Sequence, residues 1–124
     1  MELVFVYGTL KQGFNNNCLL YDSVYVGPAV TKHQYAMYSD GIPYVTEKLP
    51  LTNIIGELYE VDKHSLYNLD MLEGHPKWYK RKQIDIVTLK SYKGSNAVPG
   101  VWLYFNDYIP VTATLNTTGN YLKY

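Results

Sequence analysis

The apolar positions of this chain fall mostly into short runs, and short runs of this kind predict β-strands. The first run, residues 3–6, is rich in β-branched and aromatic side chains and ends before Gly8, as is typical of a buried strand. Gly, Pro, Asn and Asp separate the runs that follow. We predict further strands at residues 24–26, 34–38, 54–61, 79–89 and 101–105. Residues 91–100 are expected to form a hairpin loop between the last two strands.

One segment follows helical spacing instead, with leucine at every third position. Asp62 stands where an N-cap would, and Gly74 offers a stop, so we predict a helix over residues 63–72. A short helix is also expected near residues 18–20, after a turn-forming cluster. Many short strands with one clear helix favour a mixed α+β fold. At 124 residues, the chain fits one compact domain over residues 1–124.

The composition limits which binding partners and which cellular compartment we expect. Eleven basic residues balance eleven acidic ones, so no overall charge attracts nucleic acid or an anionic membrane. The mixture of charge and aromatics at residues 77–82 is short and is explained as well by alternation on an edge strand. No apolar run approaches the roughly 20 residues of a membrane helix, and residues 1–4 lack the features of a signal peptide. We predict a cytoplasmic protein that binds a small ligand and neither membrane nor nucleic acid.

Cysteine and histidine usage gives little support to metal or thiol chemistry. Cys18 is the only cysteine, which excludes an internal disulfide and suits a reducing compartment. His33, His64 and His75 lie far apart, without the paired spacing of common zinc sites, so we predict no metal. Cys18 is a formal candidate nucleophile, but a lone buried cysteine is the commoner case. The 14 tyrosines are explained mainly by amphipathic packing on strands.

The turn after the first strand is the first candidate site. Gly8 lacks a Cβ, so a ligand can approach the main chain closely at residues 7–10. Successive N–H groups that point into a concavity act as fixed partial positive charges. The turn could therefore hold an anion or an oxyanion, and it could equally be an ordinary strand end.

A second segment, residues 69–81, reads Leu-Asp-x-Leu-Glu-Gly-x-Pro-x-x-Tyr-x-Arg, which puts an acid at the end of the predicted helix. Together with Tyr-Gly-Thr-Leu-Lys near the N-terminus, it resembles the γ-glutamyl cyclotransferase superfamily, most closely its γ-glutamylamine cyclotransferase and AIG2-like branch. The likeness continues at residues 42–43, 56–62 and 119–124. The resemblance implies a small, mixed, partly closed β-barrel with flanking helices.

The resemblance also implies a reaction. In this family the α-amine of a γ-glutamyl group attacks its own γ-carbonyl, and 5-oxoproline forms as an amine leaves. The nucleophile belongs to the substrate, so proximity supplies much of the acceleration, and no Ser, Cys, metal or cofactor is needed. One carboxylate could act as base towards the α-ammonium and then as acid towards the leaving amine.

By resemblance that carboxylate is Glu73. Its predicted place at the C-terminal end of a helix, with burial, would favour the neutral acid and raise its pKa from about 4.3. The alternative is an exposed helix-end residue, since exposure is usual for Glu. Arg81 is expected to be a structural ion-pair partner or a surface strand residue.

The remaining site residues follow from the same resemblance. The turn would hold the substrate carboxylate or the oxyanion through main-chain N–H groups, and Tyr79 would orient the acid or line the pocket, unless it packs in the core. Thr9 could bond locally in the turn and is not expected to be a nucleophile. Asn16 and Asn17 align only roughly with a family stretch. The predicted substrate-binding residues are Tyr7, Gly8, Thr9, Leu10, Ile42, Pro43 and Tyr79.

The compact length and the residues around the acid favour a γ-glutamylamine such as ε-(γ-glutamyl)lysine as the substrate. Another γ-glutamyl compound, such as a γ-glutamyl amino acid or glutathione, is the first alternative. A binding module that keeps the fold and the cavity without turnover is the second. We expect a monomer.

Overall fold

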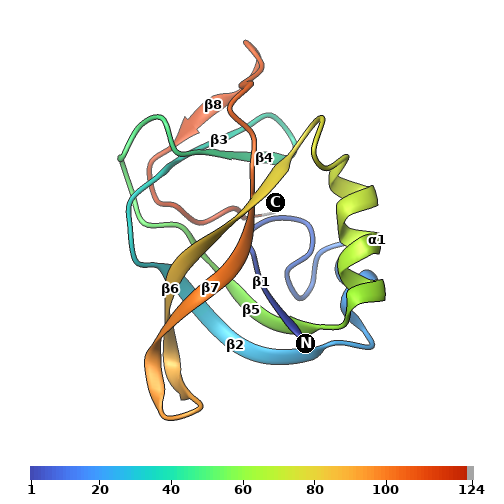
Figure 1. The fold of residues 1–124 in the computed structure, drawn as a ribbon. Helices are drawn as coiled ribbons and strands as arrows, with labels where there is room; N and C mark the ends of the chain where they lie inside the picture. The colour runs from blue at the N-terminus through green and yellow to red at the C-terminus, as the bar shows by residue number, and fades with distance from the viewer. Residues whose placement is uncertain (123–124) are drawn as a thin grey trace.

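Five strands close into a barrel, with neighbours in the order β1-β5-β2-β6-β7 (Figure 1). The structure is a computed structural model that describes residues 1–122; residues 123 and 124, the end of the C-terminal motif, lie outside the described residues. All neighbouring pairs are antiparallel except β1 and β7, which meet in parallel at Val4 and Trp102. The strands are β1 (Glu2–Val6), β2 (Val24–Thr31), β5 (Ile55–Val61), β6 (Lys80–Tyr92) and β7 (Ser95–Phe105). The mixed barrel implied by the resemblance is confirmed, and its ring of strands is closed.

A smaller sheet of order β4-β3-β8 lies against the barrel. It consists of β3 (Ala36–Ser39), β4 (Pro43–Thr46) and β8 (Thr114–Asn116). Only β3 was expected from the sequence. The other two strands are three or four residues long, so they show too little alternation to stand out, and their pairing with β3 defines them.

The prediction of a loop over residues 91–100 is wrong. Strand β6 continues to Tyr92 and β7 begins at Ser95, so only Lys93 and Gly94 form the turn. Both have positive φ, 50° and 86°, as a two-residue hairpin turn requires. The hairpin arms are mostly exposed and therefore carry polar and small residues, which resemble a loop in composition.

Helix α1 (Lys63–Glu73) confirms the prediction of residues 63–72. The Asp62 side chain accepts a hydrogen bond of 2.7 Å from the Ser65 amide and caps the first turn. At the other end Gly74 adopts the left-handed conformation, with φ 64°, and stops the helix. The short helix expected near residue 18 is the 3-10 helix η1 (Asn17–Leu20).

The core has two connected parts, and β1 contributes to both. Phe5 points into a cluster that fills the barrel, and Val4 and Val6 point into a second cluster shared with the buried face of α1. Burial on both faces explains why this strand is continuously apolar rather than alternating. The same packing holds the end of α1 next to the end of β1, where the candidate residues meet.

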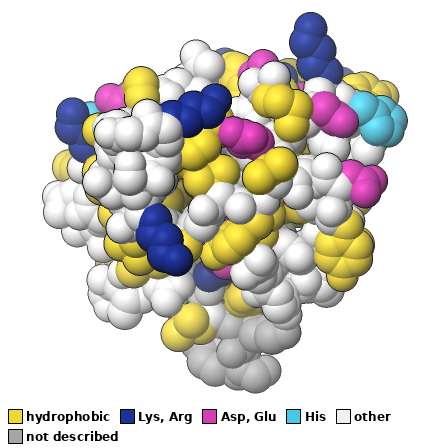
Figure 2. Space-filling model, turned by 90° about the horizontal axis from the view of Figure 1, so that it is seen from below, with side chains coloured by type: hydrophobic (Ala, Val, Ile, Leu, Met, Phe, Trp, Pro, Cys, Tyr) yellow, Lys and Arg dark blue, Asp and Glu magenta, His cyan; other side chains and the backbone are white. Residues whose placement is uncertain are grey.

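The face seen in Figure 2 carries basic and acidic side chains interspersed with apolar ones, without a field of one sign. None of the helices in residues 1–122 is long and apolar enough to cross a membrane.

Gly56 in β5 provides a test of the barrel packing. A Cβ at this position would overlap the carbonyl oxygen of Val6 and lie 2.7 Å from the Phe5 ring. Because the obstacle is backbone, Gly56→Ala should lower the free energy of unfolding by about 3 kcal/mol in urea denaturation. Gly13→Ala is the control, since nothing lies within 4 Å of its Cβ position and only its positive φ opposes the change. Equal losses in the two variants would contradict the packing argument.

Candidate active site

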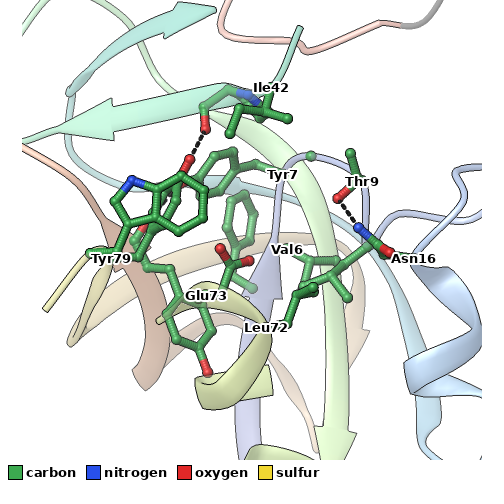
Figure 3. A pocket seen from close by; sticks show the side chains of 14 residues that line it. Val6, Tyr7, Thr9, Asn16, Ile42, Leu72, Glu73 and Tyr79 are labelled. Carbon is green, nitrogen blue, oxygen red and sulfur yellow. Dashed lines mark hydrogen bonds between the residues drawn. The ribbon is translucent and has the colours of Figure 1, made fainter. Parts of the chain in front are cut away.

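A pocket of about 120 Å³ opens where the ends of β1 and α1 approach the start of β4 (Figure 3). All the residues that the sequence singled out for the site line it, although they come from three separate parts of the chain. They are Tyr7, Gly8, Thr9, Leu10, Ile42, Pro43, Glu73 and Tyr79. The grouping supports their assignment, and their roles remain predictions.

Glu73 is the last residue of α1, and its carboxyl group points into the pocket between Tyr79 and Val6 (Figure 3). The side chain is partly buried rather than exposed, and burial raises its pKa to about 7. The main chain holds this position, because the Glu73 carbonyl accepts a hydrogen bond of 3.0 Å from the Tyr79 amide after the chain reverses at Gly74. The helix end and the following strand thus fix the acid together.

Two tyrosines beside Glu73 direct their hydroxyl protons away from it. Tyr7 donates to the main-chain carbonyl of Tyr104 at 2.6 Å, and Tyr79 donates to that of Pro43 at 2.8 Å. A carbonyl can only accept, so the protons lie on those bonds. Burial raises the pKa of both tyrosines, which keeps them neutral.

A third tyrosine, Tyr104, also lines the pocket and donates to the Asp70 carboxylate at 2.7 Å. Arg81 binds the same carboxylate through two nitrogens, at 2.8 and 3.1 Å, so of the two alternatives for Arg81 the structure shows the ion-pair partner. Burial acts to raise the pKa of Asp70, but the hydrogen bonds from Arg81 and Tyr104 outweigh it and lower that pKa. Within residues 1–122, no donor bonds to the carboxylate of Glu73, so nothing offsets its desolvation.

The glycine turn, residues 7–10, faces Glu73 across the pocket. Within the described residues, the main-chain N–H groups of Gly8, Thr9 and Leu10 donate to no protein acceptor. Thr9 bonds locally as anticipated, because its hydroxyl oxygen accepts from the Asn16 side chain at 2.8 Å. The turn therefore lines the pocket opposite the acid with main-chain donors that have no protein acceptor.

Gly8 has a packing reason as well as a ligand-binding one. A Cβ there would lie 2.6 Å from Cγ of Pro43, so only glycine allows the turn to approach the start of β4. The glycine turn and the start of β4 form two walls of the pocket, and these walls touch at Gly8 and Pro43. Ile42 and Pro43 are thereby placed at the pocket.

The sequence missed several lining residues. Asn16 aligned only roughly with the resemblance, and Tyr104 lies 97 residues from Tyr7 in an ordinary apolar strand, so no local signal pointed to it. Leu72 and Trp78 flank the acid in the motif itself and could have been included. Cys18, expected to be buried, is exposed and lies outside the pocket.

The closed barrel carries a partly buried carboxyl, with a pKa of about 7, opposite main-chain N–H groups that have no protein acceptor. This arrangement is typical of an acid–base site for a small ligand. No group of His, Cys, Asp and Glu side chains in residues 1–122 is arranged to hold a metal ion. The family model described as "Gamma-glutamyl cyclotransferase, AIG2-like" matches residues 4–123. The chain belongs to this family of enzymes.

Individual relatives agree with the family match. The chain is 45% identical over 125 residues to a Methanocaldococcus jannaschii protein provisionally named gamma-glutamylcyclotransferase, covering all of this chain and 98% of the relative. It is 32% identical to a Bos taurus gamma-glutamylaminecyclotransferase, over 85% of this chain and 74% of the other. The crystal structure of an AIG2-like protein from Mus musculus superposes with a TM-score of 0.85 at 30% identity, covering 98% of this chain and 88% of that one.

The Asp70–Arg81 pair should contribute to stability in a pH-dependent way. Its side chains are 17% and 20% exposed, so Asp70→Asn should lower the free energy of unfolding by about 1.5 kcal/mol at pH 7. Because folding lowers the pKa of Asp70, this stability is present above the unfolded pKa of about 3.9 and disappears as the pH falls through the folded value. The difference from wild type should therefore shrink below about pH 4 in urea denaturation.

The matched control is the Lys82–Glu47 pair, whose side chains are 44% and 37% exposed. Glu47→Gln should cost less than about 1 kcal/mol. An equal or larger loss for Glu47→Gln would contradict the importance assigned to Asp70.

Proposed function

We propose that this protein is a γ-glutamylamine cyclotransferase that converts ε-(γ-glutamyl)lysine into 5-oxoproline and free lysine. The observation that carries the proposal is the partly buried Glu73 carboxyl, with a pKa of about 7, opposite the unused N–H groups of the glycine turn. The family supplies the reaction class, and the named relatives include gamma-glutamylaminecyclotransferases.

Glu73 would carry two protons, one at a time, from the substrate α-nitrogen to the leaving nitrogen. Its carboxylate first takes a proton from the substrate α-ammonium, and the freed amine attacks the γ-carbonyl to form the ring C–N bond. As the tetrahedral oxyanion collapses and the bond to the leaving amine breaks, Glu73 gives its proton to the leaving nitrogen. The regenerated carboxylate then takes the second proton of the ring nitrogen, which leaves neutral 5-oxoproline, and passes that proton to the free amine, so Glu73 ends ionised as it began. A pKa near 7 suits both steps, because neither form of the carboxyl is strongly favoured near neutral pH.

The glycine turn would stabilise negative charge on the substrate. The unused N–H groups of Gly8, Thr9 and Leu10 suit the α-carboxylate or the developing oxyanion. These donors belong to the main chain, which the Asn16 bonds to Thr9 hold in place, so they would need little reorganisation during the reaction. Opposite them, the aromatic and apolar wall would keep the glutamyl group curled.

The leaving-group side of the pocket supports an amine rather than an amino acid. None of the described lining residues is a Lys or Arg, so a carboxylate close to the scissile nitrogen would lack a cationic partner. In ε-(γ-glutamyl)lysine a chain of methylenes carries the charged groups away from that nitrogen. Trp78 and Leu72, which are 51% and 37% exposed, offer apolar surface along such a chain.

We further propose that residues 1–124 act as one domain, as a monomer, in the cytoplasm. A single cysteine supports a reducing compartment. The candidate residues meet within one chain, which supports a site that needs no second copy.

A substrate panel tests the function. The purified wild type should release 5-oxoproline from ε-(γ-glutamyl)lysine faster than from γ-glutamyl amino acids or glutathione, without added metal. Glu73→Gln should lose activity by about 1,000-fold with an unchanged circular dichroism spectrum, since proton transfer then lacks its carboxyl. Glu60→Gln is the control and should remain active, because the Glu60 side chain bonds to Tyr92 and does not line the pocket.

Several results of the panel would decide against parts of the proposal. Release from none of the compounds would refute an enzymatic role, and thermal stabilisation by them without turnover would indicate a binding module. Preference for glutathione would refute the amine assignment. Full activity of Glu73→Gln would place the acid–base group elsewhere.

The pH dependence tests the environment of Glu73. The carboxyl must be ionised to accept the first proton, so kcat/KM should fall about tenfold per pH unit below a midpoint near 7. The midpoint should be the same for substrates with different leaving amines, because it belongs to the free enzyme. A midpoint at the ordinary value of about 4.3 would show that burial does not control this carboxyl.

A further inference from the structure

The last residues that the structure describes contact two walls of the pocket, the glycine turn and the β3–β4 turn. Residues 119–122, here called the C-terminal segment, contact both the residue after the glycine turn and the β3–β4 turn (residues 40–42). None of its residues lines the pocket, so any effect on a ligand must pass through the walls.

Lys11 connects the segment to the glycine turn. It directly follows Leu10, and its side chain is almost fully buried, with 7% exposed. Its ammonium group donates to the main-chain carbonyl of Tyr121 at 2.6 Å and to the Asn120 side chain at 3.2 Å. A lysine is rarely buried without a partner, so these two acceptors account for its position.

Tyr121 connects the same segment to the other wall. Its hydroxyl donates to the main-chain carbonyl of Gly41 at 2.6 Å, and its ring lies 5.7 Å from that of Phe14. Thus one residue binds Lys11 through its carbonyl and Gly41 through its hydroxyl. Two loops that are about 30 residues apart in sequence are joined by a third segment about 80 residues further on.

The β3–β4 turn depends on these bonds. Tyr121 holds the carbonyl of Gly41, and Tyr79 holds that of Pro43, so two tyrosine hydroxyls fix the turn on either side of Ile42. The pocket wall at Ile42 and Pro43 is therefore positioned by contacts outside its own strand.

The C-terminal segment is itself firmly anchored. The carbonyl of Gly119 accepts a hydrogen bond of 2.8 Å from the amide of Ile55 in β5. A Cβ on Gly119 would overlap the main-chain oxygen of Asn53, so the segment lies directly on the barrel backbone. Anchored in this way, it can hold both walls in place.

We propose that Tyr121 and Lys11 are positioning residues that hold the glycine turn and Ile42–Pro43 in place relative to each other. The proposal rests on the proposed function, since the walls would hold the curled γ-glutamyl group. Neither residue lines the pocket. Their loss should therefore weaken substrate binding and leave the proton-transfer group unchanged.

The test uses Tyr121→Phe, which removes only the hydroxyl. The KM for the γ-glutamyl substrate should rise about tenfold, with kcat within about twofold and the midpoint near pH 7 unmoved, because ground-state positioning is lost while Glu73 stays in place. Tyr108→Phe is the control, since Tyr108 is 85% exposed and lies outside the pocket. Lys11→Met should have a similar effect, and the double variant should be little worse than Lys11→Met alone.

A second measurement does not need turnover. The amide of Lys11 bonds to Gly8 in one wall, and that of Asp40 bonds to Ile42 in the other. In Tyr121→Phe both amides should exchange hydrogen about tenfold faster, whereas the Tyr79 amide, which bonds to Glu73, should not change. A purely local role at the chain end would not loosen both walls.

The results separate the two proposals. Faster exchange at one amide only, or a lower unfolding temperature with unchanged KM, would overturn the positioning role. A shifted pH midpoint would also overturn it, because the effect would then reach Glu73. If the wild type releases no 5-oxoproline, the proposed function fails, and joint loosening of both amides still supports the positioning role.

Discussion

The rest of the site depends on the desolvation of one carboxyl group. Glu73 ends α1, and the reversal at Gly74 brings the Tyr79 amide back to its carbonyl, so the side chain stays in the pocket. Water is partly excluded and no donor in the described chain replaces it, which raises the pKa to about 7. A single added donor would stabilise the anion and remove this property.

The surrounding tyrosines satisfy that constraint while they support the fold. Each of the three hydroxyls bonds to an acceptor away from Glu73, and each of those bonds joins distant parts of the chain. The bond from Tyr7 to Tyr104 joins the ends of β1 and β7, whose own pairing is limited to Val4 and Trp102. The bond that joins β1 to β7 therefore also directs one hydroxyl proton away from the acid.

Patterns in short stretches of sequence predicted those elements that are defined by residues close together in the chain. Helix α1 was predictable because Asp62 and Gly74 act on adjacent backbone, and β1 because both its faces are buried. The hairpin arms within residues 91–100 were not, since exposed strands need no apolar alternation and their polar composition resembles a loop. Strands β4 and β8 are defined by partners elsewhere in the chain.

The sequence by itself indicated the glycine turn, because a residue without a Cβ follows a buried strand there, and it indicated Glu73 through the resemblance of its motif to the γ-glutamyl cyclotransferase superfamily. The tertiary structure decided which side chains join them. Asn16 and Tyr104 reach the pocket, Cys18 does not, and the C-terminal segment connects the two walls. These contacts link residues up to about 110 positions apart, and burial and hydroxyl direction arise only when such segments pack together.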